Sequence, residues 1–314
     1  MGMAVAPFEN AFVLTGPTGA GKSRLALTLA ERLGAEIVSM DSMALYRGMD
    51  IGTAKPDADE RRRVPHHLLD VHDPWESASV AWWLRRAAAC CREIEGRGRR
   101  VLFVGGTPLY LKALLHGLFD GPPADAALRR RLAEEAERLG PAALHARLSD
   151  ADPAGAARLH PNDVRRVVRA LEVHELTGRP MSAWQTQWAR RPAGGRPVLY
   201  LNPPRPELYA RIDARVRRMI ADGLVDEVRA LRQLPRPLSR EASQALGYKE
   251  LFGHLDGKAS LEESVERIQT RSRRFARRQL TWFRSIAACV AVQDHLTFAA
   301  WGLTIEAGAV GRAS

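Results

Sequence analysis

The residues with the clearest chemistry in this sequence form the stretch GPTGAGKS, residues 16–23, directly after the apolar run Phe12–Thr15. The spacing is that of a phosphate-binding loop, G-x-x-x-x-G-K-[ST], in which backbone amides and a lysine surround a phosphate group. Lys22 supplies a point charge, and the Ser23 hydroxyl is the expected ligand of Mg²⁺. The residues that we expect to bind a diphosphate or nucleotide are Gly16, Pro17, Thr18, Gly19, Ala20, Gly21, Lys22 and Ser23. The motif leaves open whether the loop binds a nucleoside triphosphate whose terminal phosphate is hydrolysed or transferred, or a diphosphate that departs as a leaving group.

A carboxylate follows the second predicted strand. Asp41 comes just after the run Glu36–Ser39, and the carboxyl ends of parallel strands share one crevice with the phosphate loop. A carboxylate in that place can hold Mg²⁺ through water, or can act as a general base toward an incoming nucleophile. Capping of the next turn is the alternative role for Asp41.

The usual partner of such a loop in nucleotide hydrolases is an apolar strand that ends in a metal-linked aspartate. The best strand of that kind, Val101–Val104, continues instead into Gly105, Gly106 and Thr107. The stretch Leu68–Asp70 is shorter and fits less well. The sequence therefore favours a function other than that of motor or switch nucleotidases.

Short apolar runs alternate with helical patterns along the chain, which predicts a parallel sheet covered by helices. The predicted strands are Phe12–Thr15, Glu36–Ser39, Leu68–Val71, Val101–Val104 and Val198–Leu201. The predicted helices are Lys22–Leu33, Val80–Glu95, Ala127–Leu139, Pro141–Leu148, Val164–Leu176, Arg205–Leu234, Ala242–Leu255 and Leu261–Ile286. We expect an α/β fold of the P-loop NTPase-like type with a helical insertion and a helical C-terminal portion. The expected core is residues 8–118 and 196–290, the insertion is residues 119–195, and the tail is residues 291–314.

The composition points to a polyanionic partner. The 314 residues include 47 basic and 36 acidic side chains, a net charge of +11, for which nucleic acid is the leading candidate and an arginine-rich genome the alternative. Three cysteines without a C-x-x-C pair argue against a disulfide framework and a zinc site. Because no apolar run approaches the roughly 18 to 20 residues that cross a bilayer, we expect no membrane partner and a cytoplasmic location.

Arginines gather in two places. The helix predicted over Leu261–Ile286 carries seven arginines against three glutamates, and Arg271, Arg274 and Arg278 share a face beside its apolar stripe. A solvated basic face is the alternative to contact with RNA phosphates. The second cluster opens a helix of the insertion and comprises Asn162, Asp163, Arg165, Arg166 and Arg169.

Seven segments, in order, resemble one family. They are GPTGAGKS, DSMALYRGMDIGTAKP, VPHHLLDVHDP, VGGTPLYLKALLHGL, HPNDVRRVVRALEVHELTGRP, ALGYKE and RSRRFARRQLTWFR. Together they resemble the isopentenyl-tRNA transferase (IPP transferase) family, the bacterial tRNA dimethylallyltransferases, from about residue 10 to residue 285. A phosphate loop alone occurs in many families, but the whole series is highly specific.

The resemblance implies transfer of a dimethylallyl group from dimethylallyl diphosphate to N6 of an adenosine next to the anticodon of tRNA, with Mg²⁺ and release of diphosphate. It implies that Asp41 is the general base, that Thr107 lies beside the reacting centre, and that Arg211 or Arg215 contacts the diphosphate. The choice between these two arginines stays open. The residues that it implies in tRNA contact are Asp41, Ser42, Met43, Ala44, Asn162, Asp163, Arg165, Arg166, Arg169, Arg271, Arg274 and Arg278.

Three other functions are compatible with parts of the sequence. A small-molecule kinase would use the same loop for ATP, and a non-catalytic RNA-binding module would keep the loop without its chemistry. The presence of Lys22, Asp41 and Thr107 argues against the second. An isopentenyltransferase acting on free adenine nucleotides has no evident use for the arginine clusters and the insertion. A monomer is the expected oligomeric state.

Overall fold

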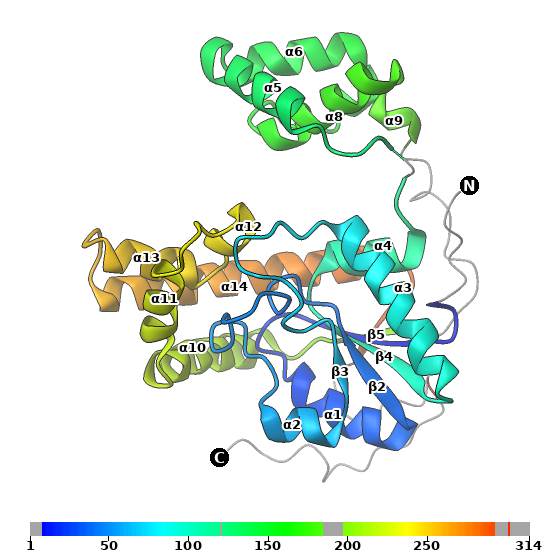
Figure 1. Ribbon diagram of the computed structural model, residues 1–314, viewed down its shortest axis with the longest axis vertical. Coiled ribbons are helices and arrows are strands. Elements are labelled where there is room, and N and C mark those ends of the chain that lie inside the picture. Colours follow the sequence, from blue (N-terminus) through cyan, green and yellow to red (C-terminus); the bar gives the residue numbers. More distant parts are fainter. Residues whose placement is uncertain (1–7, 120, 185–196, 293–300, 302–314) are drawn as a thin grey trace. The chain divides into compact units, whose positions relative to one another are not determined.

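The computed structural model describes residues 8–119, 121–184, 197–292 and 301 (Figure 1). The chain divides into two units, one containing His116–Arg191 and the other containing Val5–Leu115 and Pro192–Ser314. The first of these overlaps the predicted insertion at residues 119–195. The predicted tail of residues 291–314 lies outside the described residues apart from residues 291, 292 and 301.

A six-stranded sheet in the order β3-β2-β4-β1-β5-β6 forms the centre of the larger unit, and every neighbouring pair is parallel. The strands are β1 (Phe12–Thr15), β2 (Ala35–Ser39), β3 (His66–His67), β4 (Arg100–Gly105), β5 (Val198–Leu201) and β6 (Cys289–Val292). The central strands are buried almost throughout, as expected for a parallel sheet with helices on its faces. The predicted α/β fold class is confirmed.

The strand predicted at Leu68–Val71 is wrong. The strand in this region, β3, lies just before it, and both Leu68 and Asp70 have positive φ angles, 59° and 55°. L-residues in that left-handed region cannot continue an extended strand. The Asp70 carboxylate is instead bound between Lys55 Nζ at 2.5 Å and Arg61 Nη1 at 2.8 Å, which fixes the loop after β3.

At the beginning of the larger unit the sequence predicted the helices over Lys22–Leu33 and Val80–Glu95 but missed two shorter ones, and its predictions for the C-terminal portion differ from the structure. The helices of this unit are α1 (Lys22–Leu33), α2 (Ala58–Arg63), α3 (Val80–Gly96), α4 (Pro108–His116), α10 (Arg205–Ala221), α11 (Leu224–Arg232), α12 (Arg240–Ser243), α13 (Tyr248–Leu255) and α14 (Leu261–Ser285). The helix predicted over Arg205–Leu234 is two helices separated by Gly223, and the one over Ala242–Leu255 is α12 and α13 with Gly247 between them. Both glycines have positive φ angles, 97° and 94°, which end or precede a helical run.

Two of the apolar clusters formed by the described residues of this unit bear on the position of the site. The first lies between α1 and the sheet and includes Leu29, Leu14 and Leu102. The second joins the C-terminal helices to the loop after β2, because Tyr46 and Met49 of that loop pack among residues of α10, α11, α13 and α14. The C-terminal helices therefore fix the segment that follows Asp41.

The smaller unit is entirely helical in its described part of residues 121–184. It contains α5 (Ala126–Leu139), α6 (Pro141–Ala151), α7 (Pro153–Ala156), α8 (Val164–Thr177) and α9 (Met181–Trp184). Leu132, Leu148 and Leu171 contribute to its own hydrophobic core. Glu172 is fully buried there; burial alone raises its pKa, but hydrogen bonds from Arg129 and Arg169 hold the pKa below its ordinary value.

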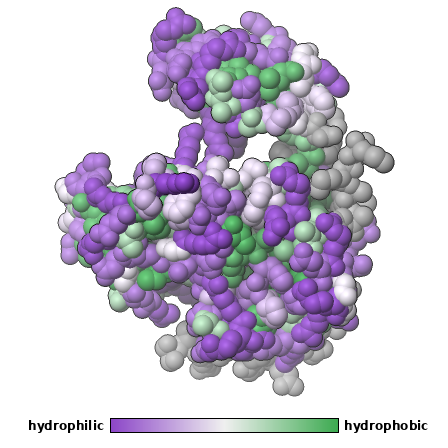
Figure 2. Space-filling view, viewed as in Figure 1, coloured by the Kyte–Doolittle hydropathy of each residue, from purple (hydrophilic) through white to green (hydrophobic). Residues whose placement is uncertain are grey.

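The surface is mainly hydrophilic on the face drawn in Figure 2, with hydrophobic areas interrupting it on both units. Among the described residues, none of the helices combines the length and apolar character needed to cross a membrane.

Candidate active site

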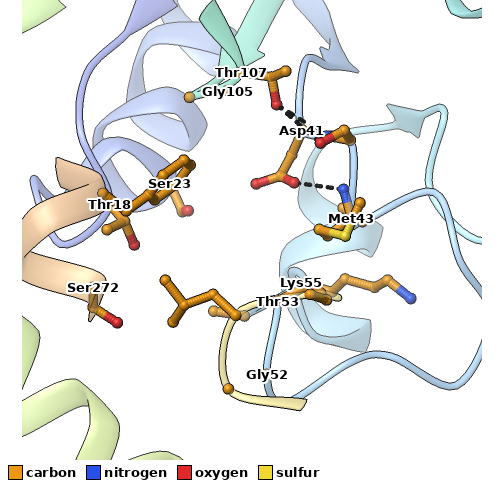
Figure 3. A pocket seen from close by; sticks show the side chains of 18 of the residues that line it. Thr18, Ser23, Asp41, Met43, Gly52, Thr53, Lys55, Gly105, Thr107 and Ser272 are labelled. Carbon is orange, nitrogen blue, oxygen red and sulfur yellow. Dashed lines mark hydrogen bonds between the residues drawn. The ribbon is translucent and has the colours of Figure 1, made fainter. Parts of the chain in front are cut away.

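The carboxyl ends of the central strands open into a cavity of about 690 Å³ within the larger unit. Its walls come from the phosphate loop after β1, the segment after β2, the turn after β4, and helices α10, α13 and α14. Figure 3 shows Thr18 and Ser23 on one side of this cavity and Asp41 on the other. The sheet thus brings together the two groups that the sequence singled out for chemistry.

The phosphate loop has the left-handed turns that its glycines allow. Gly19 and Gly21 have φ angles of 79° and 85°, and a Cβ atom on Gly19 would lie 2.7 Å from the Ile212 side chain. Lys22 Nζ donates a hydrogen bond to the Pro17 carbonyl at 2.8 Å, so the lysine crosses the loop. Of the predicted loop residues, Thr18, Lys22 and Ser23 line the cavity, whereas Gly16, Pro17 and Ala20 are buried behind it.

Two cations occupy the phosphate side of the cavity. Burial lowers the pKa of Lys22 to about 8, with a further lowering from the nearby Arg215 guanidinium that Asp41 partly opposes. Burial likewise lowers the pKa of Arg215, again opposed by Asp41. A bound anion would relieve the repulsion between these cations, so the site is electrostatically suited to a diphosphate.

The structure distinguishes the two arginines that the sequence left open. Arg215 lines the cavity and its Nη1 lies 3.3 Å from Thr18 Oγ1. Arg211 lies one helical turn earlier on α10, where its side chain is 54% exposed and pairs with Glu207. Arg211 is not among the described cavity residues, so of the two arginines only Arg215 lines the cavity.

Asp41 and Thr107 are joined by a small hydrogen-bond network. Asp41 Oδ1 accepts a hydrogen bond from the Met43 amide at 2.8 Å, which fixes the carboxylate (Figure 3). Thr107 Oγ1 accepts from the Ser42 amide at 3.1 Å, and the Thr107 amide donates to the Met40 carbonyl at 3.3 Å. The turn after β4 is thereby locked onto the segment that carries Asp41.

Gly105 shows why this turn begins with glycine. A Cβ atom at Gly105 would lie 2.2 Å from the Met40 carbonyl oxygen, so a side chain cannot fit between β4 and the segment after β2. The close approach of the two segments puts Thr107 beside Asp41. The glycine turn therefore serves the geometry of the cavity in the place where hydrolases carry a metal-linked aspartate.

Another wall of the cavity is a loop that sequence reasoning missed. Gly52, Thr53 and Lys55 line it, and the carboxylate of Glu227 on α11 holds the loop from outside. Glu227 accepts hydrogen bonds from the amides of Asp50, Ile51 and Gly52 at 2.8, 2.7 and 3.2 Å, and from the Tyr248 hydroxyl at 2.7 Å. A carboxylate 175 residues away in the chain offers no local pattern that could have predicted this contact.

The basic face of α14 opens onto the cavity. Arg271, Arg274 and Arg278 are exposed and all three line its wall, and Arg271 also pairs with Glu250 of α13. A capping box of Ser260 and Glu263 fixes the start of the helix. The other residues of the predicted tRNA set in this unit, Ser42, Met43 and Ala44, line the same cavity.

The second predicted cluster lies at the start of α8 in the helical unit. Asp163 caps the helix and pairs with Arg166 at 3.4 Å, while Arg169 is bound to Glu172 and to the Pro122 carbonyl. Arg169 therefore supports the fold of its own unit. Asn162, Arg165 and Arg166 are exposed at the surface.

The cavity offers few protein side chains that could bind a metal ion such as Mg²⁺. Across the described residues, no group of three or more His, Cys, Asp or Glu side chains is arranged to hold a metal. Mg²⁺ commonly binds through one or two protein oxygens together with substrate phosphates and water. The exposed Ser23 at the cavity wall, beside the phosphate loop, fits that donor set.

These features define an α/β protein of the P-loop type whose cavity holds a carboxylate across from the phosphate loop. Comparison with protein families identifies the family of this chain. The model described as IPP transferase matches residues 44–286, and the model described as isopentenyl transferase matches residues 9–71. The chain belongs to the IPP transferase family.

Curated relatives and solved structures agree with this assignment. A tRNA dimethylallyltransferase of Geobacillus thermodenitrificans is 48% identical over 279 residues, covering 88% of each chain. One of Geobacter metallireducens is 50% identical over 273 residues, covering 87% of this chain and 88% of the relative. The tRNA isopentenylpyrophosphate transferase of Bacillus halodurans superposes with a TM-score of 0.67 at 42% identity, covering 91% and 90% of the two chains. A eukaryotic dimethylallyltransferase acting on tRNA gives a TM-score of 0.76 at 28% identity, covering 92% of this chain and 75% of its own.

Proposed function

We propose that this protein is a tRNA dimethylallyltransferase, which moves a dimethylallyl group from dimethylallyl diphosphate to N6 of an adenosine next to the anticodon and releases diphosphate. One observation carries the proposal. A single cavity combines the cations Lys22 and Arg215 with the fixed carboxylate of Asp41. The names of the relatives supply the acceptor, tRNA.

The cations act on the leaving group. As the C–O bond of the donor breaks, negative charge builds on the diphosphate while the allyl carbon becomes cationic. Lys22, Arg215 and the amides of the phosphate loop stabilise that charge in place. A bound Mg²⁺ adds Lewis-acid neutralisation of the phosphate oxygens, and Ser23 is the protein residue that would hold it.

Asp41 acts on the acceptor. The exocyclic amine of adenine is a poor nucleophile, so it must be held in line with the allyl carbon and must lose a proton as the N–C bond forms. Asp41 accepts that proton, and the Met43 amide keeps its carboxylate oriented toward the cavity. Thr107 supports this arrangement by accepting a hydrogen bond from the amide of Ser42, the residue after Asp41.

Access of the adenine requires an unpaired base. An adenosine in a folded RNA can reach the cavity when it is extruded from the stacked loop. The exposed arginines Arg271, Arg274 and Arg278 are placed to neutralise backbone phosphates around the cavity mouth. We propose the anticodon stem-loop as the bound element, with Arg165 and Arg166 of the helical unit as further contacts, in a cytoplasmic, monomeric enzyme.

The test is transfer of a label. The protein is incubated with labelled dimethylallyl diphosphate, Mg²⁺ and unmodified tRNA, and the RNA is digested to nucleosides. We expect the label on N6 of one adenosine. Label that enters free adenine nucleotides and not tRNA, or ATP turnover without transfer, would support one of the alternative functions and contradict this one.

A further inference from the structure

The side chain of Gln279 joins two loops that meet at the cavity. This residue lies near the C-terminal end of α14 and is only 3% exposed. Its Oε1 accepts a hydrogen bond from the Thr18 amide at 2.9 Å, and its Nε2 donates to the Gly106 carbonyl at 2.6 Å. One amide therefore connects the phosphate loop to the turn after β4.

The two contacts demand an amide in one orientation. The Thr18 amide needs an acceptor and the Gly106 carbonyl needs a donor, so a carboxylate or an apolar side chain can serve at most one of them. Gly106 also allows the approach, because a Cβ atom there would lie 2.6 Å from Gln279 Nε2. The buried position makes loss of either partner costly.

Each loop carries one side of the proposed chemistry. Thr18 belongs to the loop that faces the diphosphate, and its hydroxyl lies 3.3 Å from Arg215. Gly106 directly precedes Thr107, which is bonded to Ser42 next to Asp41. One chain of contacts from the leaving-group site to the base therefore passes through Gln279, in addition to the pairing of β1 with β4 that also joins the two loops.

We propose that Gln279 is a positioning residue that sets the separation between the leaving-group side and the proton-accepting side of the cavity. The inference rests on the proposed function. In-line transfer needs the allyl carbon, the diphosphate and the acceptor amine in one geometry, and a misplacement of about 1 Å can cost about 100-fold in rate. Gln279 does not need to touch the substrate to have this effect.

The experiment compares Gln279→Met with Gln279→Glu. Methionine keeps the length of the side chain and removes both hydrogen bonds, while glutamate keeps an acceptor for the Thr18 amide and loses the donor. We expect kcat to fall by about 10- to 100-fold in both at neutral pH, with tRNA affinity within about twofold of the wild type. Gln269→Met is the matched control, because Gln269 lies on the same helix, bonds only the Asp213 carbonyl among the described contacts, and is outside the cavity wall.

A pH series separates positioning from general stability. Protonated glutamic acid has a donor and an acceptor as glutamine has, and burial raises the pKa of a carboxyl group. The ratio of Gln279→Glu activity to wild-type activity should therefore rise as the pH falls from about 8 to about 5.5, while the Gln279→Met ratio stays flat. A kcat within twofold of the wild type in both variants would overturn the proposal. So would a loss in kcat matched by an equal loss of tRNA affinity and melting temperature, without recovery of Gln279→Glu at low pH.

A binding measurement keeps this inference apart from the proposed function. Inorganic diphosphate is titrated into the wild type, Gln279→Met and Gln269→Met by calorimetry. We expect about tenfold weaker binding in Gln279→Met alone, because the Thr18 amide is no longer held. If the wild type transfers no label to tRNA, the proposed function fails while this titration still decides whether Gln279 orders the phosphate loop. Equal affinities in all three proteins would contradict that role.

Discussion

At the scale of single residues, the cavity holds two cations and one carboxylate to which different roles are proposed. Lys22, Arg215 and Asp41 all line the cavity, and Asp41 lies across it from Thr18 and Ser23 of the phosphate loop (Figure 3). Asp41 opposes the lowering of both cation pKa values, which shows that the three groups share one electrostatic environment. The sequence identified Lys22 by the spacing of the phosphate loop and Asp41 by its place after a strand. It could not distinguish Arg211 from Arg215, because residues four positions apart lie on one face of a helix.

Replacement of Asp41 by asparagine should abolish transfer and spare binding. The amide keeps the size of the side chain and its contact with Met43, but it cannot accept the amine proton. A general base contributes about 10²- to 10⁴-fold, so we expect kcat to fall by that factor while tRNA affinity changes by less than about threefold. Single-turnover transfer and filter binding measure the two. Asp59→Asn on the exposed face of α2 is the control, and equal losses of transfer and binding would make Asp41 a structural residue.

The pH dependence of donor use should report Lys22. Its pKa of about 8 means that the ammonium is charged below that pH and loses its proton as the pH rises through it. Because only the charged form stabilises a diphosphate, kcat/KM for dimethylallyl diphosphate should fall by about tenfold per pH unit above pH 8. Lys22→Arg should be less active, but its kcat/KM should not fall above pH 8, since a guanidinium stays charged. If kcat/KM of Lys22→Arg still fell above pH 8, another group would be responsible for the titration.

At the scale of elements, the C-terminal helices build half of the cavity. The sequence predicted their helical character from apolar periodicity but ran two pairs together, because the pattern continues across Gly223 and Gly247. Each of these glycines has a positive φ angle and stands at the N-cap of the following helix, which separates it from the helix before. The strand predicted at Leu68–Val71 had the right composition, yet the binding of Asp70 to Lys55 and Arg61 favours a turn. The contacts of Gln279 and Glu227 with the loops at the cavity cannot be read from the sequence, because those loops lie more than 160 residues away in the chain.

Glu227 should stabilise the loop of residues 50–55 from α11. It is half-buried and accepts hydrogen bonds from three successive amides and from Tyr248. Hydrogen bonds to a charged group contribute about 1.5–3 kcal/mol, so Glu227→Ala should lower the free energy of unfolding by at least that amount. Urea denaturation measures the effect. Asp226→Ala, at the exposed neighbouring position, should change the stability by less than about 0.5 kcal/mol, and an equal effect in both variants would contradict the role given to Glu227.

At the scale of the whole molecule, the chain carries a net charge of +11, and several arginines of α14 contribute to it at the cavity wall. Three arginines of α14 line the cavity, namely Arg271, Arg274 and Arg278. On the same helix, Arg273 is bound to Asp213, and Arg277 lies outside the cavity wall. The composition predicted an anionic partner, and the fold decides which arginines are available to it. The helical unit has its own core and adds further exposed arginines at the start of α8.

The salt dependence of tRNA binding should identify the arginines in contact. Each phosphate neutralised by a side chain adds nearly one unit to the slope of log affinity against log salt concentration. Arg274→Gln and Arg278→Gln should each reduce the magnitude of that slope by roughly one and weaken binding at low salt. Arg277→Gln, outside the cavity wall, should leave the slope nearly unchanged. A uniform effect across all three would indicate a diffuse basic surface in place of a defined contact.

The central claim is that the phosphate loop holds a leaving group whose release is coupled to capture by RNA. The most direct measurement counts diphosphate released and dimethylallyl groups incorporated in the same reaction, with and without tRNA. We predict one diphosphate for each group transferred, and no release without tRNA beyond the uncatalysed rate. Diphosphate release that is independent of tRNA, or phosphate release from ATP with no transfer, would contradict the account.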